Sequence, residues 1–273
     1  MSEIKEMFSN RHIGLTENDK NYLLKKVGYN TMDDFISDLV PNNIKRQSPM
    51  EINSELSEKE LLDKIKGYAS LNKNNVSMIG QGFYGTHVPS VILRNVLENP
   101  SWYTAYTPYQ PEISQGRLEA LLNFQTMVSE ITALPIANAS MLDESTAAAE
   151  AMTMSFKLNS NKNKVILDKY LHPQTINVIK TRAEPLGIEL IISEEPENED
   201  LTDCSSVIFQ YPNTEGKIKD FKNEIKKIQE AGTMVILVAD LLSLSLIKSP
   251  GELGADIAVG TTQRFGVPMG FGG

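Results

Sequence analysis

The sequence contains too few cysteines and histidines for a disulfide framework or a zinc site. Its 273 residues include one cysteine, Cys204, and three histidines, His12, His87 and His172. A single cysteine excludes an internal disulfide and a metal site built from several thiolates, and it fits a reducing compartment. The histidines are too scattered along the sequence to give the ligand spacing of a zinc site. We therefore expect no metal site.

Positive charge and long apolar runs are also scarce. Lysine and arginine number 26 against 35 aspartates and glutamates, which gives a formal net charge of −9. An acidic chain is poorly suited to nucleic acid or an anionic membrane surface, because both attract excess lysine and arginine. No run approaches the roughly 20 apolar residues of a membrane span, and the start, MSEIKEMF, lacks the apolar core of a secretion signal. We expect a cytoplasmic protein that binds neither nucleic acid nor membrane.

Residues 1–75 are rich in charged and amide side chains, with apolar residues at helical spacing. Thr16 is a candidate N-cap for a helix that ends at Gly28. Further helices are predicted over Thr31–Leu39 and Ser57–Ala69. The last of these has an expected buried stripe made of Leu61, Leu62 and Ile65. The pattern predicts a small helical arm, either packed on another surface or made of solvated helices with one apolar stripe each.

Glycine, proline and aromatic residues crowd together in residues 76–116, which excludes one long helix over this segment. Because so many tyrosine rings are costly to expose, we expect the segment to lie against another surface, as an interface segment. Gly80–Gly85 matches the glycine pattern of a dinucleotide-binding loop. That function requires a helix immediately after the turn, whereas Thr86–Pro89 follows in this sequence. We interpret these glycines as permitting close approach of another chain or ligand.

Residues 117–273 alternate helical and strand patterns. Short apolar segments predict strands at 164–167, 189–192, 206–211, 234–239 and 256–260. Helical spacing predicts helices at 117–134, 145–157, 174–183 and 222–231. Apolar strands that alternate with helices imply a mostly parallel sheet with helices on both faces. We therefore predict an α/β domain over this part of the chain.

Polar residues stand where the predicted strands end and a helix begins. Asp240 directly follows the strand over 234–239, and His172 comes shortly after the first strand. Ser145 and Thr146 open a predicted helix. Parallel sheets bind ligands at their carboxyl edge, and helix N-termini bind phosphate. Each residue alone is more typical of a turn or cap, but their order predicts the parts of a pyridoxal phosphate (PLP) pocket: a phosphate cradle, a stacking histidine and a carboxylate for the pyridinium nitrogen.

The lysine that PLP chemistry requires is absent from its expected place. In such a fold, the amine that binds the cofactor follows the next strand, within Gly260–Pro268, which reads GTTQRFGVP. Arg264 cannot replace it, because a guanidinium stays protonated and forms no imine. The residues thus predict a cofactor pocket without its covalent anchor.

Four segments resemble the P-protein of the glycine cleavage system, glycine dehydrogenase (aminomethyl-transferring, decarboxylating). They follow the family's order and are Phe8–Gly14 (FSNRHIG), Thr104–Gly116 (TAYTPYQPEISQG), Ile136–Asp143 (IANASMLD) and Thr261–Pro268 (TTQRFGVP). The resemblance covers essentially the whole chain and is to the N-terminal half of the family protein, the subunit 1 type. It implies the large domain of the aminotransferase-like PLP fold type I. Because the chain stops at Gly270–Gly273 inside a motif that the family continues, we expect this domain to be truncated.

The resemblance also implies where the cofactor is bound. In the family, the C-terminal half carries the PLP lysine in a His-Lys-Thr-Phe segment before a proline, and Gln263 occupies that position in this sequence. Asp240 and His172 fall at the pyridinium-carboxylate and ring-stacking positions. With Ser145 and Thr146 they make up a vestigial cofactor pocket. The resemblance therefore implies PLP in a partner half and no covalent cofactor on this chain.

The partners follow from the family reaction, the PLP-dependent decarboxylation of glycine with transfer of the aminomethyl group to the lipoyl arm of H-protein. The lysine-bearing C-terminal half, or a second P-protein subunit, is then the partner of this chain. We expect residues of this chain to line the partner's active site across the interface: His87, Tyr106, Tyr109, Gln110, Glu112, Ser114 and Gln115. Interface packing alone is the alternative role for this set.

Two other functions remain open from the sequence. One is a non-catalytic scaffold or regulatory half, and the other is an independent PLP enzyme that uses an unrecognised lysine such as Lys248. Reconstitution with the lysine-bearing half distinguishes an enzyme component from a scaffold. Covalent PLP on this chain alone supports the independent enzyme.

Overall fold

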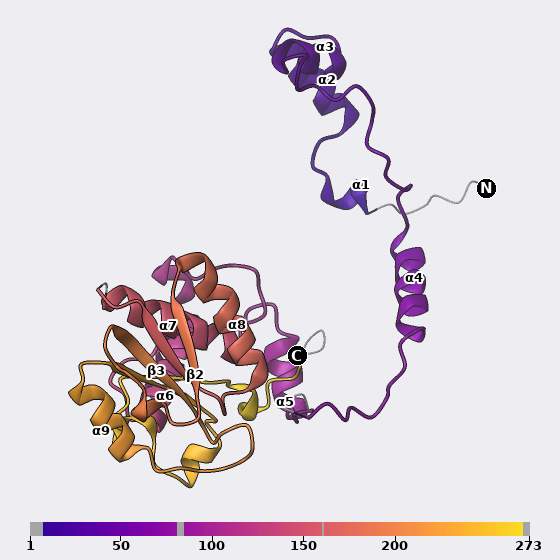
Figure 1. The fold of residues 1–273 in the computed structure, drawn as a ribbon. Coiled ribbons are helices and arrows are strands. Elements are labelled where there is room, and N and C mark those ends of the chain that lie inside the picture. The colour runs from indigo at the N-terminus through magenta and orange to yellow at the C-terminus, as the bar shows by residue number, and fades with distance from the viewer. Residues whose placement is uncertain (1–7, 81–84, 160, 270–273) are drawn as a thin grey trace. The chain divides into compact units, whose positions relative to one another are not determined.

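The computed structural model describes residues 8–80, 85–159 and 161–269. The chain divides into two compact units, Met1–Val76 and Ser77–Gly273 (Figure 1). The first unit ends next to residue 75, the expected end of the helical arm, and a further boundary at residue 116 stays a prediction. The glycine pattern over 80–85 and the chain stop over 270–273 fall mostly or wholly outside the described residues.

The first unit consists of helices that begin at capping side chains. Its helices are α1 Ser9–His12, α2 Glu17–Lys26, α3 Met32–Leu39 and α4 Glu58–Ser70. Thr16 and Ser57 each form a capping box, in which the hydroxyl accepts a backbone N–H three residues later and the acidic side chain there accepts the cap's own N–H. Thr31 caps α3 in a similar way, by accepting from the N–H of Asp34. The three helix starts predicted for this unit are confirmed.

The apolar stripe of α4 is exposed. Leu61, Leu62 and Ile65 keep 47%, 56% and 51% of their accessible surface. The prediction that this stripe is buried is therefore wrong for the first unit by itself. A unit of this size contains too few elements to cover every apolar helix face. The stripe remains an open apolar surface of the arm.

The second unit is built on a five-stranded parallel sheet in the order β2-β1-β3-β4-β5. The strands are β1 Lys164–Asp168, β2 Glu189–Ser193, β3 Cys204–Tyr211, β4 Met234–Ala239 and β5 Ile257–Val259. The α-helices described in this unit are α5 Ser90–Ile92, α6 Pro111–Thr132, α7 Glu144–Leu158, α8 Pro173–Ala183, α9 Lys222–Glu230 and α10 Pro250–Leu253. Shorter π and 3-10 turns are η1 Leu93–Leu97, η2 Glu184–Leu186, η3 Pro196–Asn198, η4 Ser243–Ser245 and η5 Gln263–Phe265. The predicted parallel sheet is confirmed.

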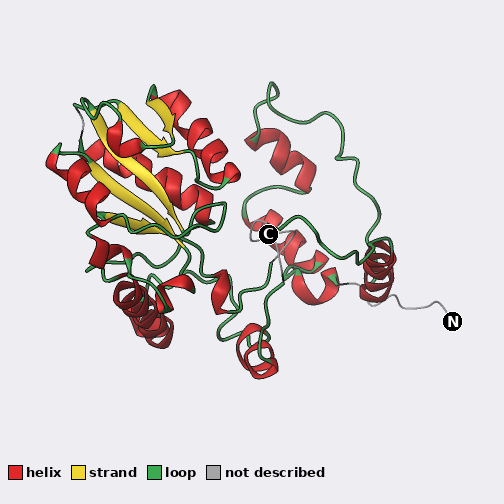
Figure 2. Cartoon of the chain, turned by 60° about the horizontal axis from the view of Figure 1, so that its bottom comes forward, coloured by secondary structure: helices red, strands yellow, loops and turns green. Residues whose placement is uncertain are grey.

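Helices cover both faces of this sheet (Figure 2). Met152 of α7 and Ile179 of α8 belong to one core cluster, together with Leu167 of β1. Ile228 of α9 and Phe209 of β3 belong to a second cluster on the opposite face. Side chains of a strand point alternately to the two faces, so strands buried on both faces are apolar almost throughout. The predicted arrangement of helices on both faces is confirmed.

Helix α6 begins at Pro111 and not at Arg117. Proline suits the first helical position, because its missing N–H has no intrahelical partner there. Ser114 departs from helical geometry (φ −125°, ψ 16°), and the helix then continues. The predicted start of this helix at residue 117 is therefore wrong. Glu112, Ser114 and Gln115 lie in a helix rather than in a loop.

The chain after β5 passes very close to the end of β4. A Cβ atom added at Gly260 would lie 2.2 Å from the carbonyl oxygen of Ala239, a backbone atom of the sheet. We expect Gly260→Ala to lower the free energy of unfolding by about 1–3 kcal/mol, the usual cost of overpacking, as measured by urea denaturation. Gly116→Ala is the matched control, because a Cβ there meets no atom within 4 Å and alanine favours the helix. Equal stability of the two variants would contradict the close approach.

Candidate functional site

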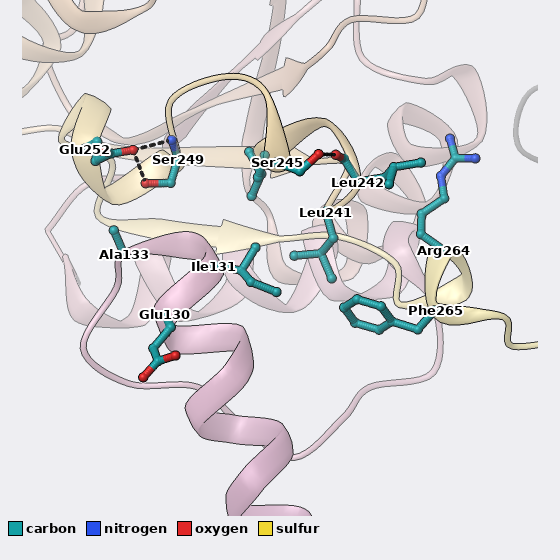
Figure 3. A pocket seen from close by; sticks show the side chains of 11 residues that line it. Glu130, Ile131, Ala133, Leu241, Leu242, Ser245, Ser249, Glu252, Arg264 and Phe265 are labelled. Atoms are coloured by element: carbon teal, nitrogen blue, oxygen red, sulfur yellow. Dashed lines mark hydrogen bonds between the residues drawn. The ribbon is translucent and has the colours of Figure 1, made fainter. Parts of the chain in front are cut away.

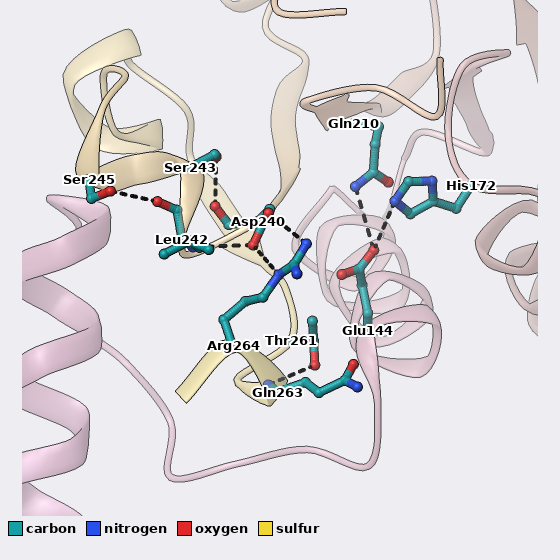
Figure 4. Close-up of polar contacts among 10 residues, drawn as sticks. All are labelled: Glu144, His172, Gln210, Asp240, Leu242, Ser243, Ser245, Thr261, Gln263 and Arg264. Carbon is teal, nitrogen blue, oxygen red and sulfur yellow. Dashed lines mark hydrogen bonds and ion pairs between the residues drawn. The ribbon is translucent and has the colours of Figure 1, made fainter. Parts of the chain in front are cut away.

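The carboxyl edge of the sheet gathers polar residues from several elements (Figure 4). Asp240 follows β4, and its N–H donates to the carbonyl of Tyr211 at 3.0 Å, which extends the pairing of β3 with β4. His172 directly precedes α8 and lies close enough for the Asp240 carboxylate to act on its pKa. The structure therefore places Asp240 and His172 at one edge of the sheet, as their positions after predicted strands indicate. Their vestigial cofactor role stays a prediction.

Arg264 binds both oxygens of the Asp240 carboxylate. Its Nε donates to Oδ1 and its Nη2 to Oδ2, each at 3.1 Å. The N–H of Leu242 adds a further hydrogen bond to Oδ1 at 3.2 Å. The two charged side chains are only 29% and 28% exposed, so bulk water competes weakly with a bidentate pair of this kind. The sequence does not predict this pairing, because the two residues are far apart along the chain.

Glu144, the first residue of α7, faces the same edge and is 18% exposed. Gln210 Nε2 donates to Glu144 Oε1 at 3.5 Å, and His172 Nε2 lies 3.8 Å from the same oxygen. Burial raises the pKa of Glu144 to about 7, and the neighbouring carboxylates of Asp240 and Asp143 add to this rise. Burial also lowers the pKa of His172, against the effect of Asp240. Burial therefore favours the neutral forms of Glu144 and His172.

Glu144 and Gln210 are site residues that the sequence analysis missed. Gln210 is 2% exposed and lies between Phe209 and Tyr211 in a strand that is buried throughout. A long polar side chain between two buried aromatic residues is the signal that points to it, because buried polar groups need partners. Its Oε1 has no hydrogen-bond partner among the described residues.

The side chain of Asp143 caps the N-terminus of α7. Asp143 Oδ1 accepts from the backbone N–H of Thr146 at 2.7 Å and from its hydroxyl at 2.6 Å. Ser145 is buried, and its hydroxyl lies 3.1 Å from that of Thr175. The predicted place of Ser145 and Thr146 in a first helical turn is confirmed. Both hydroxyls are engaged within the protein.

Tyr106, Gln110 and Ser114 form a second polar cluster around Arg117, which we call the Tyr106 cluster. Tyr106 Oη donates to Gln110 Oε1 at 3.2 Å. Arg117 donates to the carbonyl of Tyr106 at 2.9 Å and to Ser114 Oγ at 3.2 Å. Its guanidinium carbon also lies 5.1 Å from the centre of the Tyr106 ring, a cation–π distance. These contacts hold the Tyr106 side chain in one orientation.

The remaining residues of the expected lining set are exposed: His87, Tyr109, Glu112 and Gln115. His87 contacts a different part of the chain, the turn over residues 263–267. The hydroxyl of Thr86 donates to the carbonyl of Val267 at 2.8 Å, and a Cβ at Gly266 would lie 2.7 Å from the carbonyl oxygen of His87. The structure thus joins three of the predicted residues into one cluster and places His87 beside the turn that carries Arg264.

Arg264 also lines a cavity of about 470 Å³ (Figure 3). The cavity is walled by Glu130, Ile131, Ala133, Leu241, Leu242, Leu244, Ser245, Ser249, Glu252, Arg264 and Phe265. Glu252 accepts hydrogen bonds from the N–H and hydroxyl of Ser249, each at 2.8 Å, as part of the cap of α10. This wall is mainly apolar and contributes no lysine among the described residues, so it offers no amine for an imine.

The described residues show no metal cluster and no candidate membrane span. Over residues 8–80, 85–159 and 161–269, no three or more His, Cys, Asp or Glu side chains are placed to hold a metal ion. No helix within these ranges is both long and apolar enough to cross a bilayer. Cys204 is fully buried, and burial raises the pKa of its thiol to about 11, so this thiol is no nucleophile near neutral pH.

Comparison with known proteins identifies the family. The family model described as glycine cleavage system P-protein matches residues 10–273. The chain belongs to the glycine cleavage system P-protein family. It is 54% identical over 268 residues to glycine dehydrogenase (decarboxylating) of Sinorhizobium medicae (strain WSM419) and 53% identical over 269 residues to that of Pelagibacter ubique (strain HTCC1062). Both alignments cover 97% of this chain but 28% of the relative, so the chain spans less than a third of these relatives.

Solved structures agree with this P-protein assignment. The crystal structure of glycine decarboxylase (P-protein) of the glycine cleavage system, in inhibitor-bound form, matches with a TM-score of 0.83 and 34% identity, over 95% of this chain and 60% of that one. A structure of SspA in complex with cysteine matches at a TM-score of 0.53 and 14% identity, over 68% of this chain and 57% of that one, and shows a shared fold alone. The predicted α/β fold of the PLP type is confirmed.

The edge residues of this P-protein chain do not fit PLP. Gln263 stands at the position that needs a lysine by the resemblance, and its amide cannot form an imine. Arg264 occupies both oxygens of Asp240, the carboxylate that a pyridinium nitrogen would need. Asp143 and Glu144 place two carboxyl groups at the helix N-terminus where a phosphate would bind. We therefore assign no cofactor chemistry to these residues.

The raised pKa of Glu144 predicts a pH-dependent stability. Because its folded-state pKa of about 7 lies above the ordinary 4.5, the folded protein holds this proton more tightly than the unfolded chain, and the contribution of Glu144 to stability falls as pH rises between these values. Glu144→Gln removes this loss. Relative to the unsubstituted protein, we expect the variant to gain roughly 1–3 kcal/mol on going from about pH 5 to about pH 8, measured by urea unfolding at both pH values.

Glu150→Gln on the same helix is the control, because Glu150 is 47% exposed. Its effect should be nearly the same at both pH values. A Glu144→Gln effect that does not change with pH would show that this carboxyl group is not buried as described.

Proposed function

We propose that this chain is the cofactor-free part of a glycine decarboxylase and that it completes the active site of a lysine-bearing partner part. The activity of the whole protein is then the PLP-dependent decarboxylation of glycine, with transfer of the aminomethyl group to the lipoyl arm of H-protein. The observation that supports this proposal is that side chains of this chain already occupy the carboxyl edge of the sheet. Arg264 binds the Asp240 carboxylate, and the Asp143 carboxylate caps the N-terminus of α7. A P-protein chain whose residues do not fit PLP must act with one that holds it.

The comparisons support the assignment of the cofactor to a part of the P-protein outside this chain. The relatives carry the name glycine dehydrogenase (decarboxylating), and this chain corresponds to 28% of their length. We assign PLP and its lysine to a lysine-bearing part, which is either the rest of the same protein or a second P-protein subunit. The proposed partners of the assembled protein are glycine and the lipoyl H-protein.

The Tyr106 cluster supports a lining role in the partner's active site. Arg117 holds the Tyr106 ring, and the Tyr106 side chain remains 40% exposed. A hydroxyl and an amide held in fixed geometry are suited to orient the carboxylate of glycine or the departing aminomethyl group. Glu112, exposed in the first turn of α6, adds an acceptor. His87, Tyr109, Ser114 and Gln115 complete the proposed lining set.

Exposed apolar residues around this cluster support an interface at the same place. Trp102, Tyr103 and Tyr109 are 45%, 76% and 86% exposed. Aromatic side chains gathered on a surface mark contact with another protein surface, because their exposure to water is unfavourable. The same surface is compatible with packing alone, and the effect of conservative substitutions on turnover distinguishes the two roles.

No observation favours the other two functions. Lys248, the candidate for an independent PLP enzyme, is exposed between η4 and α10 and does not line the 470 Å³ cavity. A scaffold or regulatory half differs from our proposal in one measurable respect. It does not need to contribute to the turnover of glycine once the lysine-bearing part is folded.

Reconstitution tests the proposed function. We expect release of labelled CO2 from carboxyl-labelled glycine when this chain, the lysine-bearing part, PLP and H-protein are combined, and none from this chain with PLP and H-protein alone. The physical reason is that the electron sink for decarboxylation is bound elsewhere. Full turnover by the lysine-bearing part without this chain would favour the scaffold, and turnover of glycine by this chain alone would refute the proposal.

Substitutions in the lining set test the role of the Tyr106 cluster. In the assembled enzyme, we expect Tyr106→Phe and Glu112→Ala each to lower kcat/KM for decarboxylation roughly tenfold, the usual effect of losing one hydrogen bond to a charged substrate. Tyr68→Phe is the matched control, because this tyrosine of α4 is 59% exposed and loses the same hydroxyl outside the cluster and the proposed interface. Unchanged kcat/KM in both cluster variants would leave interface packing as the only role.

A further inference from the structure

The carboxyl edge of the sheet carries charged groups of its own at two positions. These are the positions predicted to hold the pyridinium nitrogen and the phosphate of PLP. A pyridinium ring nitrogen is a cation that pairs with a carboxylate, and a phosphate is an anion that binds backbone N–H groups at a helix N-terminus. At the first point, the Arg264 guanidinium holds both oxygens of Asp240 at 3.1 Å. At the second, the Asp143 carboxylate accepts the N–H of Thr146 at 2.7 Å.

We propose that Arg264 and Asp143 are built-in counter-ions that take the places of the pyridinium and the phosphate, and that they close this crevice to PLP independently of the missing lysine. This inference rests on the proposed function, in which PLP belongs to the lysine-bearing part. The closure is electrostatic at both ends. A pyridinium would meet a guanidinium that does not lose its proton, and a phosphate would meet a carboxylate that already caps the helix.

The two ends are linked by a third carboxyl group. Glu144 directly follows Asp143 in the chain and lies at the same edge of the sheet as Asp240 (Figure 4), and both carboxylates raise its pKa. An incoming phosphate would therefore face two carboxyl groups from one helix turn. Above its pKa of about 7, Glu144 is charged and adds to the unfavourable field that Asp143 creates at the α7 N-terminus.

Hydrogen bonds and close backbone packing hold the turn that carries Arg264. The Gln263 N–H donates to the hydroxyl of Thr261 at 3.2 Å. The carbonyl of Val267 accepts from the hydroxyl of Thr86 at 2.8 Å, and Gly266 adopts a φ of +92° against the backbone of His87. Because the backbone on both sides of Arg264 is held, withdrawal of the guanidinium from Asp240 requires its side chain to give up two charge-assisted hydrogen bonds.

The experiment restores a lysine with and without the counter-ions. In the assembled full-length protein, we compare Gln263→Lys alone with Gln263→Lys combined with Arg264→Thr and Asp143→Ser, a change that keeps a helix-capping hydroxyl. Each protein is incubated with PLP and reduced with borohydride, and the pyridoxyl group is located by peptide mass. The matched control combines Gln263→Lys with Arg182→Thr, which removes an exposed arginine paired with Glu150 on the surface.

We expect at least roughly tenfold more pyridoxyl label at position 263 in the triple variant than in the Gln263→Lys protein or the matched control, since each removed counter-ion held a charge-assisted hydrogen bond. Label at position 263 in the single variant at the level of the triple variant overturns the inference. A triple variant that keeps its circular dichroism spectrum without gaining label also overturns it. Where the triple variant does not fold, the double variant Gln263→Lys with Arg264→Thr is judged by the same two criteria.

The unsubstituted protein tests the proposed function separately. Its label should map to the lysine-bearing part, which also shows that PLP was delivered. Label on a lysine of this chain in the unsubstituted protein would refute the proposed function, whatever the variants show.

Discussion

The ion pair between Asp240 and Arg264 fixes the geometry of the carboxyl edge. Asp240 directly follows strand β4, and Arg264 lies in the turn that follows β5, so the pair connects two strand ends at the edge of the sheet. Close backbone packing at Gly260 brings that turn near β4, and contacts with the segment at Thr86 hold its other side. A ligand at this edge would have to displace a bidentate salt bridge that is mostly shielded from water.

Much of the second unit could be predicted because its signals are local. Short continuous apolar runs such as β4, which alternate with segments of helical period, indicate strands buried on both faces of a sheet. Thr16 and Ser57 mark helix starts by a hydrogen bond made within one turn. The predicted start of α6 is wrong because Pro111 belongs to a proline-rich segment, and proline is typical both of loops and of the first helical position. Burial of the apolar stripe of α4 has no local signal, because a helical period predicts an apolar face but not what covers it.

Only those residues of the site that closely follow strands could be predicted from the sequence. Asp240 and His172 reach one edge because parallel strands all end there. The partner of Asp240 depends instead on how the chain returns after β5, and nothing local to Asp240 encodes a bond to Arg264. Burial of Glu144 likewise depends on the packing of α7 against β3 and β4, so the rise of its pKa to about 7 has no sequence signal. Gln210 is the exception, since a glutamine within a buried strand demands a polar neighbour.

The half-buried charges at the carboxyl edge of the sheet must be balanced by the chain's own groups. Asp240 is only 28% exposed, and an unpaired carboxylate in that position would be costly to fold. Arg264 supplies the missing positive charge, a pKa of about 7 lets Glu144 keep its proton below neutral pH, and the lowered pKa of His172 favours its uncharged form. The same arrangement that makes the edge stable without PLP also makes it unsuitable for PLP. The contacts that balance the charges of this edge are thus the same contacts that support the proposed role of a lysine-bearing part.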